Sequence, residues 1–270
     1  MPAPGAGAGC WTGAPSAALD EDGAVLLAYR VRDVERRGAA VVVARAADGE
    51  RFEPVAMLDK DRFGAESLER PALVRVGDGW RLYVCCATPS SKHWWIDALD
   101  AADPAALPAA EARTVLPGDE RTGVKDPVVR LDDGRWRAWI CCHPLGDAGE
   151  EDRMTTALAT SHDGLAWHWE ATVLGPRPGA WDARGARVTA VLPDGRAFYD
   201  GRATKGENFR ERTGVAEPAA GGALAAAGDE PVADVRYLDL LALPGGGWRL
   251  YYEAPLPDGS HELRTELIPR

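Results

Sequence analysis

The segments DGWRLYVCCATP (residues 78–89) and DGRWRAWICCHP (residues 133–144) carry one pattern, a turn containing glycine followed by an alternating apolar run. Three further segments carry the same pattern: DGAVLLAYRVRD (22–33), DGRAFYDGRATK (194–205) and GGWRLYYEAPLP (246–257). The five turn glycines lie 56, 55, 61 and 52 residues apart, at Gly23, Gly79, Gly134, Gly195 and Gly247. A repeat of this period indicates an array of similar structural units.

Each turn is preceded by a second run rich in branched residues, so each unit opens with a β-hairpin. Two units continue with another pair of strand-like runs, VVVARAADGERFEPVAML (41–58) and TALATSHDGLAWHWEATVL (156–174). Four strands in about 50 residues is typical of a propeller blade. We therefore predict an all-β fold, one five-bladed β-propeller domain over residues 1–270 with four-stranded antiparallel blades. The predicted blades cover roughly 11–58, 68–116, 124–174, 182–220 and 235–270.

Three smaller expectations follow from the repeat. Residues 262–268 are expected to form the third strand of the last blade, and the N-terminal segment its fourth. Residues 97–112 are the one stretch with weak helical periodicity. Trp80, Trp136 and Trp248 recur at one blade position, which favours a packing role.

Composition narrows the possible functions. The formal net charge of −11 argues against nucleic-acid binding through the general surface field. The first ten residues lack the basic and apolar regions of a signal peptide, and no stretch is apolar enough to span a membrane. The cysteine number is odd, at five, and four of them form adjacent pairs, unlike a secreted disulfide framework. These features predict a cytoplasmic protein with reduced thiols and no membrane partner.

First strands line the central channel of a propeller, so the residues that open them are the candidates for a site. In the second unit these are Glu69 and Arg70, and in the third Lys125 and Asp126. The fourth and fifth units offer four basic or acidic residues and one tyrosine: Asp182, Arg184, Arg187, Arg236 and Tyr237.

The motifs ERP (69–71), KDP (125–127) and SHDGLAW (161–167) resemble those of five-bladed propeller glycosidases, namely glycoside hydrolase families 43 and 32 and the mannoside phosphorylase family 130. The resemblance implies a sugar substrate and carboxyl groups that cleave or transfer a glycosidic bond. One carboxylic acid protonates the leaving oxygen, and a second carboxylate activates water or attacks the sugar. Glu69, Asp126 and Asp182 are the catalytic candidates.

Blade 1 departs from the resemblance, because those hydrolases place an Asp just before a proline where this chain has Ala14 before Pro15. The fourth unit also lacks the expected Glu and reads WDARGAR (181–187). An enzyme with rearranged chemistry, hydrolase or phosphorylase, is the leading hypothesis. The alternatives are a propeller that binds a sugar or metabolite without cleaving it and an enzyme of specialised metabolism that has recruited the scaffold.

Basic residues gather near the predicted channel mouth in this otherwise acidic chain. Arginine binds carboxylate or phosphate through paired hydrogen bonds, so an anionic substrate, with inorganic phosphate as a further candidate, is expected. The predicted substrate-binding cations are Arg30, Arg70, Lys125, Arg184, Arg187, Arg202 and Arg236. The other predicted contacts are Trp11, Trp94, Trp95, His143, Tyr237 and Glu253. No metal-ligand spacing is present, and we predict no metal and no cofactor.

Overall fold

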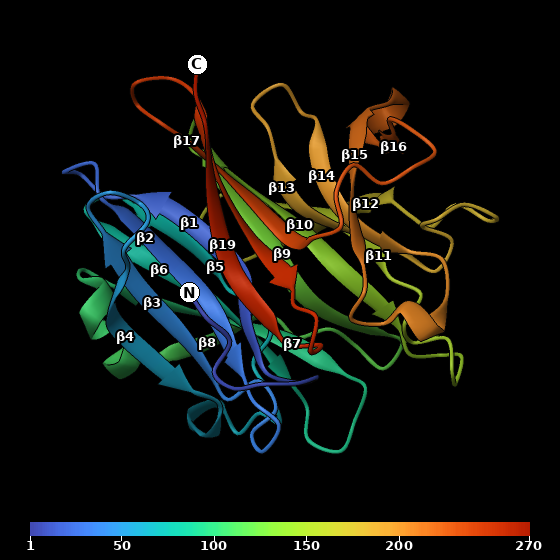
Figure 1. Ribbon diagram of the computed structural model, residues 1–270, viewed down its shortest axis with the longest axis horizontal. Helices are drawn as coiled ribbons and strands as arrows, with labels where there is room; N and C mark the ends of the chain where they lie inside the picture. The colour runs from blue at the N-terminus through green and yellow to red at the C-terminus, as the bar shows by residue number, and fades with distance from the viewer.

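The computed structural model describes residues 1–270 and is built from nineteen β-strands and four short 3-10 helices (Figure 1). The all-β prediction is confirmed. The 3-10 helices are η1 (Lys60–Phe63), η2 (Pro104–Ala109), η3 (Lys205–Glu207) and η4 (Ala220–Gly222). None of the helices has the length and apolar character needed to cross a lipid bilayer.

Three of the four sheets are antiparallel and four-stranded, with strands in chain order. One contains β5 (Ala72–Val76), β6 (Gly79–Ala87), β7 (Trp94–Ala101) and β8 (Ala112–Leu116). The next contains β9 (Thr122–Asp132), β10 (Arg135–Pro144), β11 (Thr155–Ser161) and β12 (His168–Leu174). The third contains β13 (Gly185–Val191), β14 (Ala197–Arg202), β15 (Arg212–Pro218) and β16 (Leu224–Ala226).

The fourth sheet has seven strands and joins the two ends of the chain. It contains β1 (Trp11–Leu19), β2 (Val25–Arg32), β3 (Ala40–Ala46), β4 (Glu53–Asp59), β17 (Arg236–Ala242), β18 (Trp248–Pro255) and β19 (His261–Ile268). The red strand β19 lies beside the blue strand β1 in Figure 1, and Trp11 pairs with His261 in a parallel bridge. The first residue also reaches β19, since the Met1 ammonium donates to the Leu263 carbonyl at 2.7 Å.

The first strands of the five hairpins contact one another in cyclic order: β1 with β5, β5 with β9, β9 with β13, β13 with β17, and β17 with β1. The hairpins therefore surround one central region, and residues far apart in sequence meet there.

Bulges shape the inner strands at that centre. Asp126 and Pro127 of β9 lie between the paired residues Lys125 and Val128, whose partners on β10 are separated by only one residue. A bulge of this kind re-aims the neighbouring side chains. Asp126 has a φ of 51°, and the residues in the corresponding bulges of β1 and β17, Ala14 and Tyr237, have φ values of 54° and 51°. Non-glycine residues rarely adopt this left-handed conformation, and its recurrence marks one shared position in three strands.

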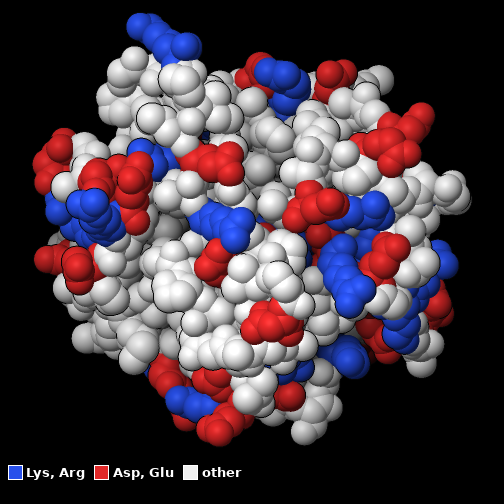
Figure 2. Space-filling view, in the orientation of Figure 1, with Lys and Arg blue, Asp and Glu red and all other residues white.

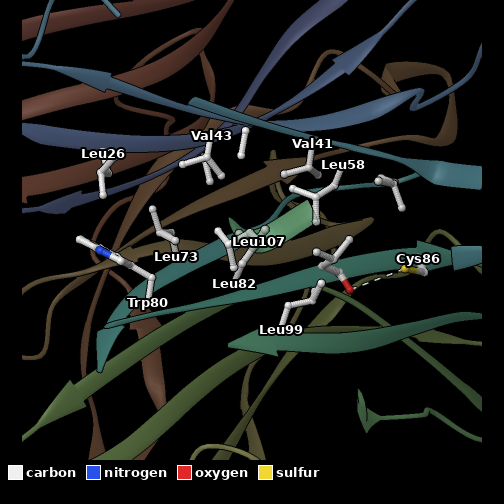
Figure 3. Close-up of a cluster of buried hydrophobic side chains, with 14 of the residues drawn as sticks. Leu26, Val41, Val43, Leu58, Leu73, Trp80, Leu82, Cys86, Leu99 and Leu107 are labelled. Atoms are coloured by element: carbon white, nitrogen blue, oxygen red, sulfur yellow. Dashed lines mark hydrogen bonds between the residues drawn. The ribbon is translucent and has the colours of Figure 1, made fainter. Parts of the chain in front are cut away.

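The hydrophobic core lies between neighbouring sheets. Figure 3 shows Leu26, Val41 and Leu58 of the seven-stranded sheet facing Leu82 and Leu99 of the β5–β8 sheet, and all five are almost completely buried. Burial of this apolar area is the main force that holds the sheets together.

Two local expectations have different outcomes. Trp80 and Trp136 are buried in the core, as their recurrence predicted, and Trp248 is half-buried. The helical interpretation of 97–112 is wrong, because this stretch holds the end of β7, the single 3-10 turn η2 and the start of β8. Pro108 limits the helix to this short segment, since a proline inside a helix removes a hydrogen bond.

Candidate functional site

A cavity of about 520 Å³ opens where the inner strands converge. This volume falls within the range of small-molecule sites. The lining includes side chains from β2, β9, β13 and β17 together with connecting segments. The lining residues are Trp11, Arg30, Arg32, Arg37, Glu69, Lys92, Trp94, Lys125, His143, Gly149, Glu151, Asp152, Met154, Arg187, Arg202, Lys205, Asn208, Phe209, Glu211, Arg236 and Tyr237.

The cavity wall is positively charged although the protein is acidic. Nine lining residues are Lys or Arg and four are Asp or Glu, a difference of +5, against −11 for the whole chain. Three carboxylates and one cation lie buried near the wall, namely Asp126, Asp200, Glu253 and Arg70, and including them reduces the excess of positive charge to +3. The outer surface, in contrast, has acidic and basic side chains interspersed, as Figure 2 shows for one face. The cavity is therefore where the structure concentrates positive charge.

Glu69 lies at the cavity wall but is held by other side chains. Arg30 Nη1 donates to its Oε2 at 2.6 Å, and Ser67 Oγ donates to its Oε1 at 3.1 Å. Burial opposes ionisation, but the Arg30 and Lys125 charges outweigh it and lower the pKa of Glu69. Glu69 is thus an ionised carboxylate in an ion pair.

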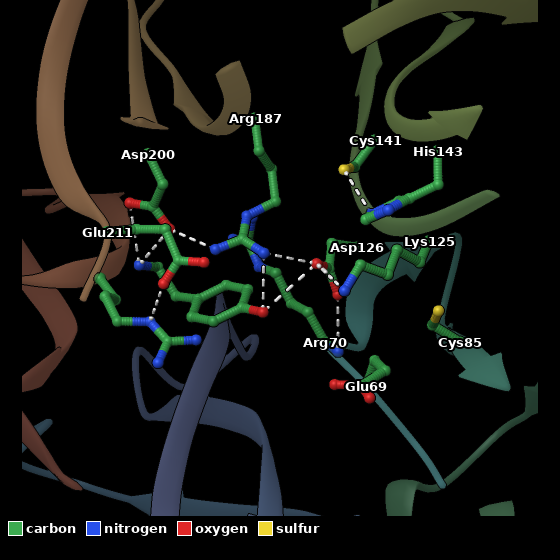
Figure 4. A network of polar contacts seen from close by, with 12 residues as sticks. Glu69, Arg70, Cys85, Lys125, Asp126, Cys141, His143, Arg187, Asp200 and Glu211 are labelled. Carbon is green, nitrogen blue, oxygen red and sulfur yellow. Dashed lines mark hydrogen bonds and ion pairs between the residues drawn. The ribbon is translucent and has the colours of Figure 1, made fainter. Parts of the chain in front are cut away.

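Asp126 is completely buried and engaged on both oxygens (Figure 4). Arg187 Nη1 donates to Oδ2 at 2.8 Å, and the Arg70 backbone N–H donates to Oδ1 at 3.2 Å. The Tyr237 hydroxyl also donates to Oδ2, at 3.3 Å. Burial raises the cost of the charge, yet Lys125 and Arg187 hold the pKa of Asp126 far below its ordinary value.

Arg187 links this pair to a second buried carboxylate. Its Nη2 donates to Asp200 Oδ2 at 2.6 Å, and Asp200 also accepts from the Tyr237 backbone N–H at 3.0 Å. The guanidinium carbon of Arg187 lies 3.8 Å from the centre of the Tyr237 ring, a cation–π contact. Burial raises the pKa of Asp200 despite the Arg187 charge.

Glu253 sits where its counterparts on β6 and β10 are Cys85 and Cys141. It is fully buried, with Oε2 3.1 Å from Arg30 Nη2 and Oε1 3.4 Å from Arg236 Nη1. His261 Nδ1 lies 3.2 Å from the same Oε1. Burial opposes the charge, but Arg236 and the other neighbours lower the pKa of Glu253 to about 2.

Glu211, like Glu253, is a buried carboxylate between two arginines, here Arg202 of β14 and Arg236. Arg202 Nη1 donates to its Oε1 at 2.5 Å, and Arg236 Nε lies 3.1 Å from its Oε2. Burial is again outweighed, here by Arg236, Arg187 and Arg202, so the pKa of Glu211 falls to about 2.

Three lining cations have no carboxylate within ion-pair distance: Arg32, Lys92 and Lys205. Arg32 lies over the Trp11 ring, 4.4 Å from its centre. Burial lowers the pKa of Arg32 to about 10, at which the side chain is still charged at neutral pH. These charges are available to an anion that enters the cavity.

Aromatic side chains border the same space. Trp11 and Phe209 pack with ring centres 4.7 Å apart, and Trp94 packs on His143 with ring centres 5.0 Å apart. Burial first, and then the Lys125 charge, lower the pKa of His143 to about 3. His143 is therefore neutral, and Lys125 lies over the Trp94 ring at 5.1 Å.

Most of the predicted site residues come together at this cavity, but six do not line it. Asp126 and Glu253 lie buried near the wall, and the other four are Asp182, Arg70, Trp95 and Arg184. Asp182 is bound by Arg177 Nε at 2.9 Å and by the Tyr199 hydroxyl at 2.9 Å. Arg70 lies behind the wall, where its Nε donates to the Pro15 carbonyl. Trp95 packs against the core between the seven-stranded sheet and the β5–β8 sheet, and Arg184 lies outside the lining, paired with Asp152.

Sequence reasoning missed eight lining residues with charged or aromatic side chains. They are Arg32, Arg37, Lys92, Glu151, Asp152, Lys205, Phe209 and Glu211. The sequence could have indicated Arg32, because residues two apart in a strand point to the same side and Arg30 was already a candidate. Phe209 and Glu211 lie in the segment between β14 and β15, where no periodic pattern fixes a position. No cluster of three or more His, Cys, Asp or Glu side chains is arranged to hold a metal ion.

Comparison with known proteins supports the fold. No protein-family model and no curated protein sequence matches the chain significantly. Solved structures do match. A thermostable family-43 glycoside hydrolase superposes with a TM-score of 0.74 at 13% identity, covering 95% of this chain and 89% of the other. An α-L-arabinofuranosidase from Lactobacillus brevis gives 0.70 at 15% identity, with 95% and 90% covered.

A β-1,2-mannobiose phosphorylase from Listeria innocua gives a TM-score of 0.65 at 15% identity, covering 89% of this chain and 85% of the phosphorylase. The chain therefore has the fold of the β-propeller glycosidases, as the motif resemblance predicted. At these identities the likeness concerns the fold.

Proposed function

We propose that the chain binds a small anionic carbohydrate in the central cavity, and that it does not cleave glycosidic bonds with a pair of carboxyl groups. The observation that carries the proposal is the cavity wall, where nine cations face four carboxylates. Binding of an anion there gains charge-assisted hydrogen bonds in a partly dehydrated site, where they are stronger than in water. The glycosidase-type fold and the aromatic border support a sugar as the rest of the ligand.

The ionisation of the carboxyl groups argues against glycoside hydrolysis. A general acid must hold its proton near neutral pH, which requires a raised pKa. Glu69, Asp126, Glu211 and Glu253 all have lowered pKa values and arginine partners. Ala14 occupies the place of the expected blade 1 carboxylate. Neither half of the acid–base pair is therefore supplied by these residues.

Phosphorolysis is the second candidate, because inorganic phosphate is itself an anion suited to the same cations. In that reaction phosphate attacks the sugar carbon and takes the place of a carboxylate nucleophile. A mannobiose phosphorylase is among the structural neighbours, alongside glycoside hydrolases. It still requires a proton donor for the leaving oxygen, so Glu69 or Asp126, both ionised in the free protein, would have to gain a proton when the ligand binds.

Closure of the fold is also part of the proposal. We infer that the five hairpins are the inner strands of a five-bladed propeller, with the last unit completed through the parallel contact of β19 with β1. The cyclic contacts between first strands support this inference. The five cysteines are free, which supports a reducing compartment such as the cytoplasm.

Calorimetric titration tests the binding proposal. D-Glucuronate has a carboxylate where D-glucose has a hydroxymethyl group, so the difference in their affinities measures the contribution of the negative charge. We expect glucuronate to bind at least about tenfold more tightly at low salt, the effect of roughly one charge-assisted hydrogen bond. Addition of salt should weaken glucuronate binding more than glucose binding. Equal affinities for the two sugars, or no binding of glucuronate, would overturn the proposal.

Turnover assays separate the second candidate from the first. Aryl glycosides are incubated with and without inorganic phosphate, alongside Glu69→Gln and Asp126→Asn. Phosphate-dependent release that is lost in either variant establishes phosphorolysis. Release without phosphate, lost in the same variants, establishes hydrolysis and contradicts our account.

A further inference from the structure

One loop places a carboxylate on the cations at the edge of the cavity. Residues 145–153 form a loop between β10 and β11, and Gly149, Glu151 and Asp152 of this loop line the cavity. Asp152 Oδ1 accepts from Arg184 Nη2 at 2.7 Å, and its Oδ2 accepts from Arg184 Nε at 3.1 Å. Its Oδ2 also lies 3.4 Å from Arg202 Nη2. The carboxylate thus bridges two arginines.

This arrangement resembles the way arginines hold an external anion. Two oxygens of one carboxylate on Arg184 form a paired contact, the geometry that favours carboxylate and phosphate recognition. Lys205 lines the same edge, and no carboxylate lies within ion-pair distance of it. Three cations therefore meet at a place where the chain supplies its own anion.

Arg184 also pairs with Glu150, whose side chain is 40% exposed. Of the two carboxylates on Arg202, Asp152 is the one that a ligand can displace more readily. Its side chain is 20% exposed, whereas the side chain of Glu211, on the other nitrogen of Arg202, is 3% exposed. Exchange of Asp152 for another anion leaves the Arg202–Glu211 pair intact and keeps the charge of the cluster unchanged. Such an exchange avoids leaving an uncompensated buried charge.

The structure leaves room for the displaced loop. A second hollow of about 500 Å³ borders the loop, lined by Glu150, Pro178 and Arg184 among others, and it shares Gly149 and Lys205 with the cavity. A side chain at Gly146 or Gly149 would meet open space, while the Gly149 carbonyl accepts from Arg184 Nη2 at 3.0 Å.

We propose that Arg184, Arg202 and Lys205 form the subsite that receives the anionic group of the ligand, and that Asp152 occupies this subsite in the free protein. The ligand's carboxylate or phosphate replaces Asp152, and the loop 145–153 moves away from the cavity. The proposal rests on the proposed binding function and adds where the anion binds and what it displaces.

Titration of three variants with D-glucuronate, and with inorganic phosphate as a second probe, tests the subsite. Removal of the internal competitor in Asp152→Asn should tighten binding about tenfold or more. Removal of a receiving cation in Arg184→Gln should weaken binding by a similar factor. Asp100→Asn is the matched control, since Asp100 forms a paired contact with Arg81 at 2.6 and 2.9 Å far along β7 and its loss changes the net charge equally. It should leave affinity within about twofold.

The outcomes separate this inference from the proposed function. If wild-type protein binds glucuronate but Asp152→Asn binds it no more tightly, the subsite is overturned and the function stands. If neither wild type nor Asp152→Asn binds glucuronate or phosphate, the proposed subsite and the proposed binding function are both overturned. Circular dichroism and thermal unfolding show whether each variant folds. If Asp152→Asn does not fold, Arg184→Gln decides, because a purely structural role for the Asp152–Arg184 pair predicts unchanged or tighter binding in that variant.

Discussion

Replacement of Glu253 by Gln tests the idea that buried carboxylates hold the cationic centre together. Glu253 is fully buried and lies within 3.4 Å of both Arg30 and Arg236. Gln keeps the shape and a hydrogen-bond acceptor but removes the charge, so two buried guanidinium groups lose part of their compensation. Breaking a buried ion pair from one side costs about 3–5 kcal/mol. We expect this loss in the free energy of unfolding, a large share of the roughly 5–15 kcal/mol of a typical domain.

Urea denaturation followed by circular dichroism measures the effect, with Asp100→Asn as the control. The Asp100 carboxylate is half exposed, and exposed pairs contribute about 0–1 kcal/mol. The difference between wild type and Glu253→Gln should also shrink in acid. The folded pKa of Glu253, about 2, is below its ordinary value, so its contribution is present above about pH 4.5 and is lost as pH falls toward 2. A loss below about 1 kcal/mol at neutral pH, equal to that of the control, would refute the reasoning.

Three further predictions concern single positions. Gly13→Ala should lower the free energy of unfolding by about 1–3 kcal/mol, because a Cβ there would lie 2.2 Å from Glu253 Oε2, whereas Gly146→Ala meets open space and should be neutral; equal denaturation midpoints would contradict this. His143 has a folded pKa of about 3, below its ordinary value near 6.5. The free energy of unfolding should therefore decrease as the pH is lowered from 6.5 to 3, by up to about 1.4 kcal/mol per pH unit. His143→Gln should flatten that profile, and an unchanged slope in thermal unfolding would show that the imidazole is not buried neutral. Cys141, whose pKa burial raises to about 12, should resist iodoacetamide in the native protein and react after unfolding, as mass spectrometry would show.

The sheets were predictable because their signals are local. Each glycine turn and alternating run lies within about a dozen residues, so the hairpins follow from the sequence without knowledge of their partners. The recurrence of the unit then places the first strands side by side. The interpretation of 97–112 as helical failed because a short apolar run fits a buried strand as well as a helix.

The site was predictable only where it depends on strand position. Glu69, Lys125, Asp126 and Arg236 open first strands, and the structure brings all four to the centre. Their ionisation was not predictable, because each pKa depends on partners such as Arg30 that lie elsewhere in the sequence.

Irregular segments account for the remaining differences. Asp182 precedes β13 and is turned toward Arg177, a residue in an irregular segment that no pattern relates to it. Glu211 and Asp152 come from connecting loops, and only tertiary packing sets their positions. Loops carry much of the chemistry of this scaffold, which is why a repeat alone does not identify its function.

A crystal structure of the protein with D-glucuronate bound tests the central claim most directly. Our account predicts the sugar in the 520 Å³ cavity, with its carboxylate against Arg184, Arg202 or Lys205 and with Asp152 displaced. A sugar bound elsewhere on the molecule, or one whose carboxylate points away from the cavity cations, would contradict it.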